Sequence, residues 1–156
     1  MAARGKAAKG RKPTRRKASA TARDQEAEMA VARLAREVEE WADVMSEIPK
    51  LARVRRFAES RLSQRLSLKR VARIARFEYT YFSTWFHTSV GTNFSTWLSS
   101  LRVLEATRHL RRRRKPLEAI AKEVGFGHLR TMERAFKKRL GMTPKQFRSM
   151  VSGEGK

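Results

Sequence analysis

The 156-residue chain contains no cysteine, which excludes disulfide bonds, thiol nucleophiles and metal sites built on cysteine. It has no apolar run near the roughly 18 residues that a membrane-spanning helix requires, and no apolar signal-peptide core follows its start. Acidic residues are scarce, with 15 Asp and Glu against 37 Lys and Arg. These absences predict a soluble, intracellular protein that does not span a membrane, and the length predicts one modest domain with appendages.

The excess of basic residues indicates the kind of partner. A formal net charge of +22 attracts polyanions, either nucleic acid or an anionic membrane surface. The chemistry of an enzyme is missing, because there is no glycine-rich phosphate loop and no His–carboxylate spacing typical of a catalytic site. His87, His109 and His128 also lack the spacing of a metal site. We therefore expect a nucleic-acid-binding protein without catalytic activity, metal or cofactor.

Charge divides the chain into three parts. Residues 1–21 contain eight Lys and Arg, no acid and hardly any large apolar side chain. Such a composition cannot offset the conformational entropy lost on folding, so we predict a disordered basic tail that either contacts DNA phosphates or only aids solubility. Residues 22–48 contain eight acidic and three basic residues, a net charge of −5. This leaves +19 for residues 49–156, because the tail carries +8.

The acidic segment contains an apolar seam with alternating spacings of four and three. Its members are Ala27, Val31, Leu34, Val38, Trp41, Met45 and Ile48. This heptad pattern predicts an amphipathic helix over 22–48 that ends before Pro49. The sequence leaves open two uses of the seam. Either two chains self-associate through a short coiled coil, or the helix covers an apolar patch on its own domain.

The basic part contains an internal repeat. From Leu68 the sequence is LKRVARIARFEYTYFSTWFHTSVG, and from Leu117 it is LEAIAKEVGFGHLRTMERAFKKRLG. The apolar positions of the two copies coincide, with one extra residue in the second turn. Each copy predicts two helices joined by a tight turn, with the small Ala72 or Ala121 where the helices cross. This pattern is typical of the helix-turn-helix motif, whose second helix enters the major groove of DNA.

Local signals place the two motifs at about 67–91 and 116–141. Ser67 can cap the first helix, and Pro116 suits the first position of its counterpart. Asn93 can cap a long helix between the motifs, about 18 residues or roughly 27 Å in length. That length is close to the roughly 34 Å between successive major grooves on one face of B-DNA. A rigid connector of this kind would let one chain contact two adjacent grooves.

From about Pro49 to Met150 the sequence resembles the AraC/XylS-type regulators. The strongest likeness is IAKEVGF, followed by RAFKKRLGMTPKQFR, and the first copy follows the same family in YFSTWFHTSVGTNFSTWLSSLR. The resemblance implies an all-α domain over 49–150, with tandem helix-turn-helix motifs, a long linker helix and about seven helices in total. The 48 residues before this domain are too few for the family's usual effector domain, so we expect a regulator without one. A capping box from Thr143 predicts the last helix, and 151–156 are expected to form a flexible end.

Four positions depart from the family pattern. Arg76 stands where the family often has glycine, and a left-handed conformation there would cost about 1 kcal/mol or more. Glu78 and His128 stand where better helix caps are usual. Thr84 replaces a frequent arginine on the first recognition helix, which shortens the charged reach to DNA. We therefore expect the first motif to contribute less affinity than the second.

Helical periodicity assigns an outward face to each recognition helix. The predicted DNA-contacting residues are Thr80, Ser83, Thr84 and His87 on the first helix, and Arg130, Glu133, Arg134 and Lys137 on the second. Arginine can donate two hydrogen bonds to guanine, and glutamate can accept one from cytosine. Glu133 has the alternative of an ion pair with Lys137. Lys138 and Arg139 are candidates for phosphate contacts.

These patterns predict a sequence-specific transcription regulator that inserts two recognition helices into adjacent major grooves. The alternative is an architectural nucleoid protein that binds DNA with little sequence choice, which the charge of the basic part keeps open. The expected partner is double-stranded DNA, with RNA polymerase as a second candidate. The expected location is the cytoplasm, in association with the nucleoid.

Overall fold

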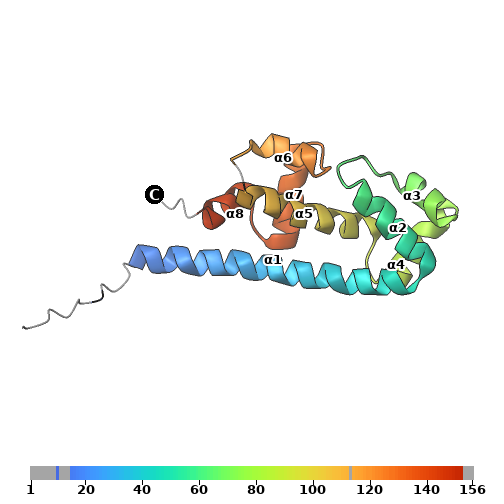
Figure 1. Cartoon of the computed structure of the whole chain (residues 1–156), viewed down its shortest axis with the longest axis horizontal. Helices are drawn as coiled ribbons and strands as arrows, with labels where there is room; N and C mark the ends of the chain where they lie inside the picture. The colour runs from blue at the N-terminus through green and yellow to red at the C-terminus, as the bar shows by residue number, and fades with distance from the viewer. Residues whose placement is uncertain (1–9, 11–14, 113, 153–156) are drawn as a thin grey trace, which may run out of the picture.

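The structure is a computed structural model that describes Gly10, residues 15–112 and residues 114–152. This part of the chain contains eight helices and no strand (Figure 1). The helices are α1 Arg15–Glu47, α2 Pro49–Ser60, α3 Leu68–Ala75, α4 Tyr79–Val90, α5 Phe94–Arg112, α6 Leu117–Glu123, α7 Leu129–Leu140 and α8 Pro144–Val151. The predicted all-α fold is confirmed, with seven helices in the domain and one before it.

The first helix begins earlier than the charge pattern predicted. It starts at Arg15, so the prediction of a disordered tail through residue 21 is wrong for residues 15–21. The segment 15–22 contains three alanines and no glycine or proline, a composition that favours a helix despite its positive charge. Residues 1–9 and 11–14 of the predicted tail lie outside the described residues, as do 153–156 of the predicted flexible end.

The apolar seam of α1 is buried in its own domain. Ala27, Leu34, Val38 and Met45 are at most 8% exposed. α1 contacts α2, α4, α5, α7 and α8, and it runs along one edge of the molecule (Figure 1). This packing corresponds to the second of the two uses that the sequence left open. A coiled coil through the same seam would require the helix to leave the domain.

The interior is divided into two hydrophobic cores, one for each motif. The first is built on Phe82, Phe86, Phe94 and Trp97, with Met45 of α1. The second is built on Ile120, Met132, Phe136 and Phe147, with Ala27, Ala30, Leu34 and Val38 of α1. The half-buried Trp41 of α1 and Leu101 of α5 pack against both cores. Each motif therefore has its own core, and α1 and α5 contribute side chains to both cores.

Side-chain caps set the ends of several helices. Ser67 Oγ accepts a hydrogen bond from Arg70 N at 3.2 Å, and Asn93 Oδ1 accepts one from Thr96 N at 2.8 Å. The predicted capping box between Thr143 and Gln146 is present. Pro116 is the N-cap residue of α6, one position before the place predicted for it. These caps pair amide groups that the first turn of a helix would otherwise leave without partners.

The turn of the first motif contains a strained residue. Arg76 has φ 58° and ψ 46°, and it is the one non-glycine residue with positive φ in the described part of the chain. The corresponding turn of the second motif has glycines at positive φ, at Gly125 and Gly127. An L-residue other than glycine places its Cβ too close to the following carbonyl in this conformation. The predicted departure from the family pattern is thus also a site of strain.

Replacing Arg76 with glycine should therefore stabilise the protein. We expect Arg76→Gly to raise the free energy of unfolding by about 0.5–1 kcal/mol, because the strain relieved exceeds the entropy that glycine adds to the unfolded chain. Urea denaturation measures the difference. Arg73→Gly is the control, since the same change inside α3 should destabilise by about 1 kcal/mol. A lower free energy of unfolding in Arg76→Gly than in the wild type would contradict the claim that Arg76 is strained.

Candidate DNA-binding surface

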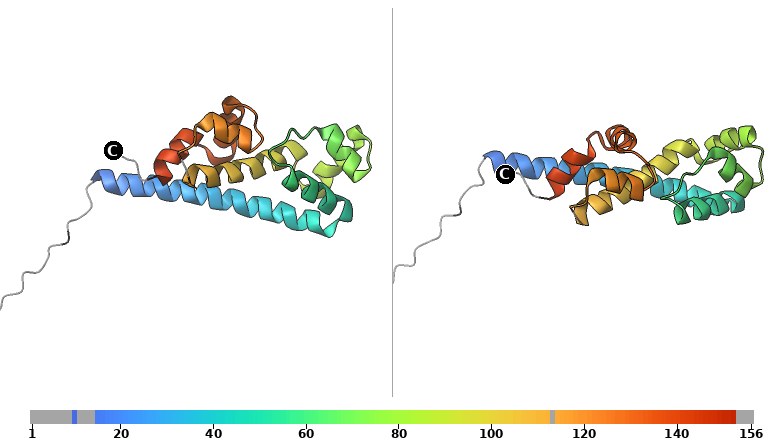
Figure 2. Two further views of the ribbon diagram at one scale, coloured as in Figure 1. Left: turned by 45° about the horizontal axis from the view of Figure 1, so that its top comes forward. Right: turned by 90° about the horizontal axis from the view of Figure 1, so that it is seen from above.

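The two recognition helices, α4 and α7, occupy equivalent places in their motifs. Each is 12 residues long and ends at a glycine in the left-handed conformation, Gly91 with φ 90° and Gly141 with φ 74°. Each follows a shorter helix, α3 or α6, after a tight turn. Seen from above, α4 and α7 lie toward the same side of the linker helix α5 (Figure 2, right). The sequence repeat is therefore also a structural repeat.

The N-terminus of α4 is capped by a carboxylate. Glu78 Oε2 accepts hydrogen bonds from Thr80 N at 3.0 Å and Tyr81 N at 3.4 Å, and also from the Thr80 hydroxyl. The hydrogen bond from the Thr80 side chain is the main reason why the pKa of Glu78 lies below its usual value. A negative group at this position also complements the helix dipole. Glu78 is thus an effective cap, contrary to the expectation of a poor one.

The N-terminus of α7 is capped from a neighbouring helix. His128 is the N-cap residue and makes no side-chain cap, as the sequence predicted. Instead, Glu118 of α6 accepts a hydrogen bond from Leu129 N at 3.3 Å through its Oε2. The first helix of the motif therefore positions the start of the second. This cap links the entry angle of α7 to the placement of α6.

The structure exposes most of the residues predicted to contact DNA. Thr80, Ser83, Thr84, His87, Arg130, Arg134 and Lys137 are exposed. Glu133 is half-buried, and it forms no ion pair with Lys137 among the described residues. The hydroxyl of Thr80 is engaged by Glu78. Arg130, Arg134 and Lys137 are therefore the exposed charged side chains of the predicted set.

The exposed faces are centred differently from the prediction. At 100° per residue, the buried Phe82, Phe86 and Val90 place Thr84 and Thr88 at the middle of the outer face of α4. The buried Met132, Phe136 and Leu140 place Arg134 and Lys138 in the same way on α7.

Tyr81 and Thr131 occupy equivalent positions in the repeat and lie nearer these centres than Ser83 and Glu133. Both are exposed, and Tyr81 is 57% exposed. Sequence reasoning missed them together with Thr88, although the alignment of the two copies places Tyr81 on Thr131 and Thr88 on Lys138. An aromatic residue beside the core residues of an amphipathic helix is ordinarily assigned to the core. The 57% exposure of Tyr81 shows that it belongs to the outer face instead.

Arg139 corrects one part of the predicted site. Its Nη2 lies 2.5 Å from Glu37 Oε2 of α1, and its guanidinium lies over the ring of Trp41 at 5.7 Å. The Arg139 side chain is only 16% exposed, and its Nε atom is buried without a hydrogen-bond partner among the described residues. Arg139 therefore faces α1 and not the solvent, so it is not available as a phosphate contact. Lys138 is exposed and remains a candidate.

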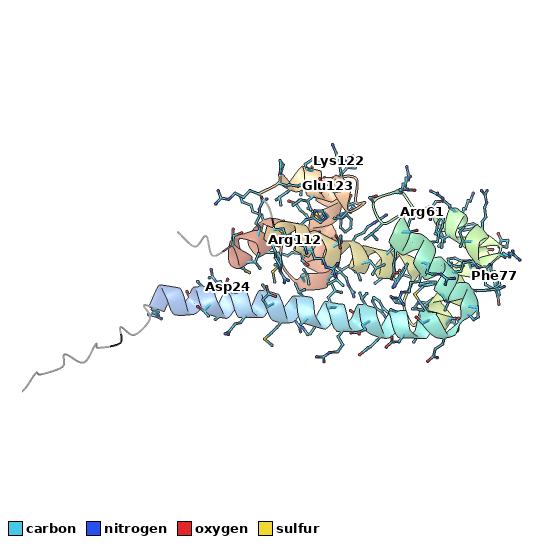
Figure 3. All side chains as sticks on the ribbon, viewed as in Figure 1. Asp24, Arg61, Phe77, Arg112, Lys122 and Glu123 are labelled. Carbon is cyan, nitrogen blue, oxygen red and sulfur yellow. The ribbon has the colours of Figure 1, made fainter. Side chains whose placement is uncertain are left out.

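Charge is distributed unevenly over the molecule. The exposed basic residues of α3 are Lys69, Arg70 and Arg73. Lys122 of α6 projects at one edge of the molecule, and Asp24 lies on α1 at the opposite edge (Figure 3). α3 therefore carries three exposed cations, α6 combines Lys122 with the exposed Glu118 and Glu123, and α1 carries the acidic segment. Exposed cations such as those of α3 are typical of a surface that contacts phosphates.

Two other kinds of site are missing from the described residues. No group of three or more His, Cys, Asp or Glu is arranged to hold a metal ion. None of the described helices is both long enough and apolar enough to span a membrane.

Two helix-turn-helix units with exposed polar second helices define a DNA-binding domain of the helix-turn-helix class. Residues 71–150 match the family model described as "Helix-turn-helix domain". The chain belongs to this family, of the AraC type. The resemblance seen in the sequence is thereby confirmed.

Known proteins similar to this chain share the same part of it. A Bacillus subtilis protein, the uncharacterized HTH-type transcriptional regulator YobQ, is 31% identical over 100 residues, which cover 64% of this chain and 42% of that protein. The chain therefore matches less than half the length of this relative.

Two solved structures also cover this region. The C-terminal domain of AraT, a response regulator from Geobacillus stearothermophilus, has a TM-score of 0.60 at 29% identity, over 65% of this chain and 84% of that one. The DNA-binding domain of AdpA, solved with a target DNA, has a TM-score of 0.62 at 24% identity, over 67% of this chain and 94% of that one. The second likeness concerns the fold alone.

Arg134 is the residue whose removal best tests the exposed face of α7. Arg134→Ala should weaken binding to the preferred DNA by about 1–3 kcal/mol and weaken binding to random DNA much less, because a lost base contact affects one sequence only. Fluorescence anisotropy with a duplex selected from a random pool measures both affinities. The control is Arg36→Ala, which removes an exposed arginine of α1. Equal losses of affinity for the preferred and the random DNA would show that Arg134 contacts phosphate and not a base.

Proposed function

We propose that this protein is a sequence-specific transcription regulator that places α4 and α7 in adjacent major grooves of one DNA duplex. The observation that carries this proposal is the placement of α4 and α7 at equivalent positions of the two motifs, toward the same side of the linker helix, each with an exposed polar face. The groups available are those that recognise base edges, with arginine foremost on α7. Family membership supports the same function.

The length of the linker helix supports simultaneous binding of both motifs. α5 contains 19 residues, which corresponds to about 28 Å. Successive major grooves on one face of B-DNA are about 34–36 Å apart. The remaining difference lies within the reach of the motifs on either side of α5, or is taken up by a small bend of the duplex. One chain therefore suffices for a two-groove site.

The two motifs are proposed to contribute unequally. The outer face of α7 carries Arg130, Arg134 and Lys138, whereas the outer face of α4 carries Thr80, Thr84 and Thr88. Long cationic side chains reach both phosphates and guanine edges, and threonines reach only groups close to the helix. The second motif would thus supply most of the affinity, and the first would add sequence preference. As a regulator, the protein would act on the nucleoid in the cytoplasm, and RNA polymerase stays a predicted second partner.

A footprint on selected DNA tests this mode of binding. Hydroxyl-radical cleavage should show two protected segments about one helical turn apart on one face for each bound chain. Specific binding should exceed binding to random DNA by about 10³ or more. Protection of one segment only would show that the first motif is not engaged. A ratio near one would favour the alternative of an architectural protein.

The basic segment before α1 should affect affinity without affecting sequence preference. Residues 2–14 contain five Lys and Arg, and each phosphate neutralised contributes about −0.9 to the slope of log affinity against log salt. If half of these charges contact DNA, deletion of 2–14 should make the slope shallower by about 2. This deletion leaves α1 and its seam intact. An unchanged slope would reduce the segment to an aid to solubility.

A further inference from the structure

α1 lies outside the part of the chain that matches the helix-turn-helix family, yet it contacts both motifs. The family match begins at residue 71, whereas α1 ends at Glu47. Its 33 residues correspond to about 50 Å, enough to pass along both hydrophobic cores. Trp41 packs against both cores, while Leu34 belongs to the second and Met45 to the first. α1 thus connects the two motifs along an edge that α5 does not cover.

Polar contacts anchor α1 to both halves of the domain. On the second motif, Glu37 binds Arg139 of α7, and Glu28 binds Arg111 at the end of α5 at 2.7 Å. Arg139 is only 16% exposed, so its pair with Glu37 is shielded from solvent more than an ordinary surface pair. On the first half of the domain, Arg55 of α2 donates to Ala42 O at 3.2 Å and to Ser46 Oγ at 2.9 Å. The helix is therefore fixed at several points along its length.

A second link joins the two motifs away from α1. Arg102 of α5 donates hydrogen bonds to Leu62 O at 3.1 Å and Gln64 O at 2.8 Å, in the segment between α2 and α3. The same carbonyl of Leu62 lies against Gly125, in the turn of the second motif. A Cβ added to Gly125 would lie 2.1 Å from Leu62 O. The first half of the domain and the second turn are therefore in direct contact.

We propose that α1 fixes the separation and the relative rotation of α4 and α7, and thereby determines the spacing between the two DNA half-sites that the protein accepts. The inference rests on the proposed two-groove binding mode. α1 contacts both recognition helices, and Glu37 holds α7 directly through Arg139. Because α4 and α7 are held in this way, they cannot move apart or rotate to follow a change in the position of the second groove. The residues of α1 that determine spacing are then Trp41 and Glu37, neither of which belongs to a recognition helix.

The geometry of DNA makes spacing a sensitive property. One inserted base pair moves the second groove by about 3.4 Å and rotates it by about 34°. A rigid protein must lose contacts or deform the duplex to meet both half-sites, and either one costs affinity. A protein with a loosened α1 can turn one motif to follow the groove. Loosening α1 should therefore reduce the penalty for an altered spacing, and affinity for a single half-site should stay the same.

The test compares the full chain with three variants on a set of duplexes. The starting duplex is the best one selected from a random pool, and its derivatives carry one or two extra base pairs between the half-sites, or one half-site only. Trp41→Ala removes the side chain of α1 that packs against both cores. Glu37→Gln keeps the shape of the side chain and removes the charge that pairs with Arg139. Met29→Ala, 66% exposed on the same helix, is the matched control.

The wild type and Met29→Ala should lose about tenfold or more in affinity on the duplex with one extra base pair, a loss of about 1.4 kcal/mol or more. Trp41→Ala and Glu37→Gln should lose at least threefold less on the same duplex, with affinity for the single half-site unchanged. Thermal unfolding establishes that each variant is folded at the temperature of the assay. If Trp41→Ala does not fold, Glu37→Gln carries the comparison.

The outcomes separate this inference from the proposed function. If the wild type binds one half-site as tightly as two, two-groove binding is wrong and the inference falls with it. If the wild type requires both half-sites but tolerates the altered spacing, the inference alone is overturned. The inference alone is also overturned if folded Trp41→Ala and Glu37→Gln lose as much affinity as the wild type on the duplex with one extra base pair.

Discussion

Burial of the apolar seam of α1 is the contact on which the rest of the molecule depends. The two motifs have separate cores, and a core of this size rarely supplies more than about 3–5 kcal/mol by itself. Each Leu, Val or Met side chain of the seam that leaves water contributes about 1.5–3 kcal/mol. Because Leu34 and Val38 join one core and Met45 joins the other, the same helix completes both. Both recognition helices, α4 and α7, contact this shared cover.

Much of the fold could be predicted from the sequence, because the signals are local and occur twice. The spacing of Phe82 and Phe86, repeated in Met132 and Phe136, is enough to indicate two buried helix faces. Ser67 and Asn93 make the predicted caps because a cap involves residues only three positions apart. The start of α1 could not be predicted in this way. Charge and hydrophobicity both argue against order in 15–21, and the alanines that favour a helix there carry a weak signal.

The candidate site was less predictable, because its details depend on contacts distant in sequence. Arg139 follows the exposed lysines 137 and 138, and no local pattern separates it from them. Its partner, Glu37, is 102 positions away. Glu118, which caps α7, belongs to the preceding helix, so inspection of His128 alone could not reveal it. Tyr81 was missed for a different reason. It is an aromatic residue among core aromatics, although the residue is 57% exposed.

The acidic charge of α1 also bears on how the molecule meets its target. Residues 15–47, which form α1, contain six basic and eight acidic residues, a net charge of −2, whereas residues 49–156 carry +19. α1 runs along one edge of the molecule, and the basic helix α3 lies away from it (Figure 1). This uneven distribution of charge makes the α1 edge less attractive to a polyanion than the rest of the molecule, and so gives the protein an electric dipole with its negative end toward α1. Near the polyanionic duplex, the dipole exerts a torque that turns the acidic edge away before any contact forms. A larger share of diffusional encounters then begins with the motifs facing the DNA, so association is faster at low ionic strength and slows as salt screens the field.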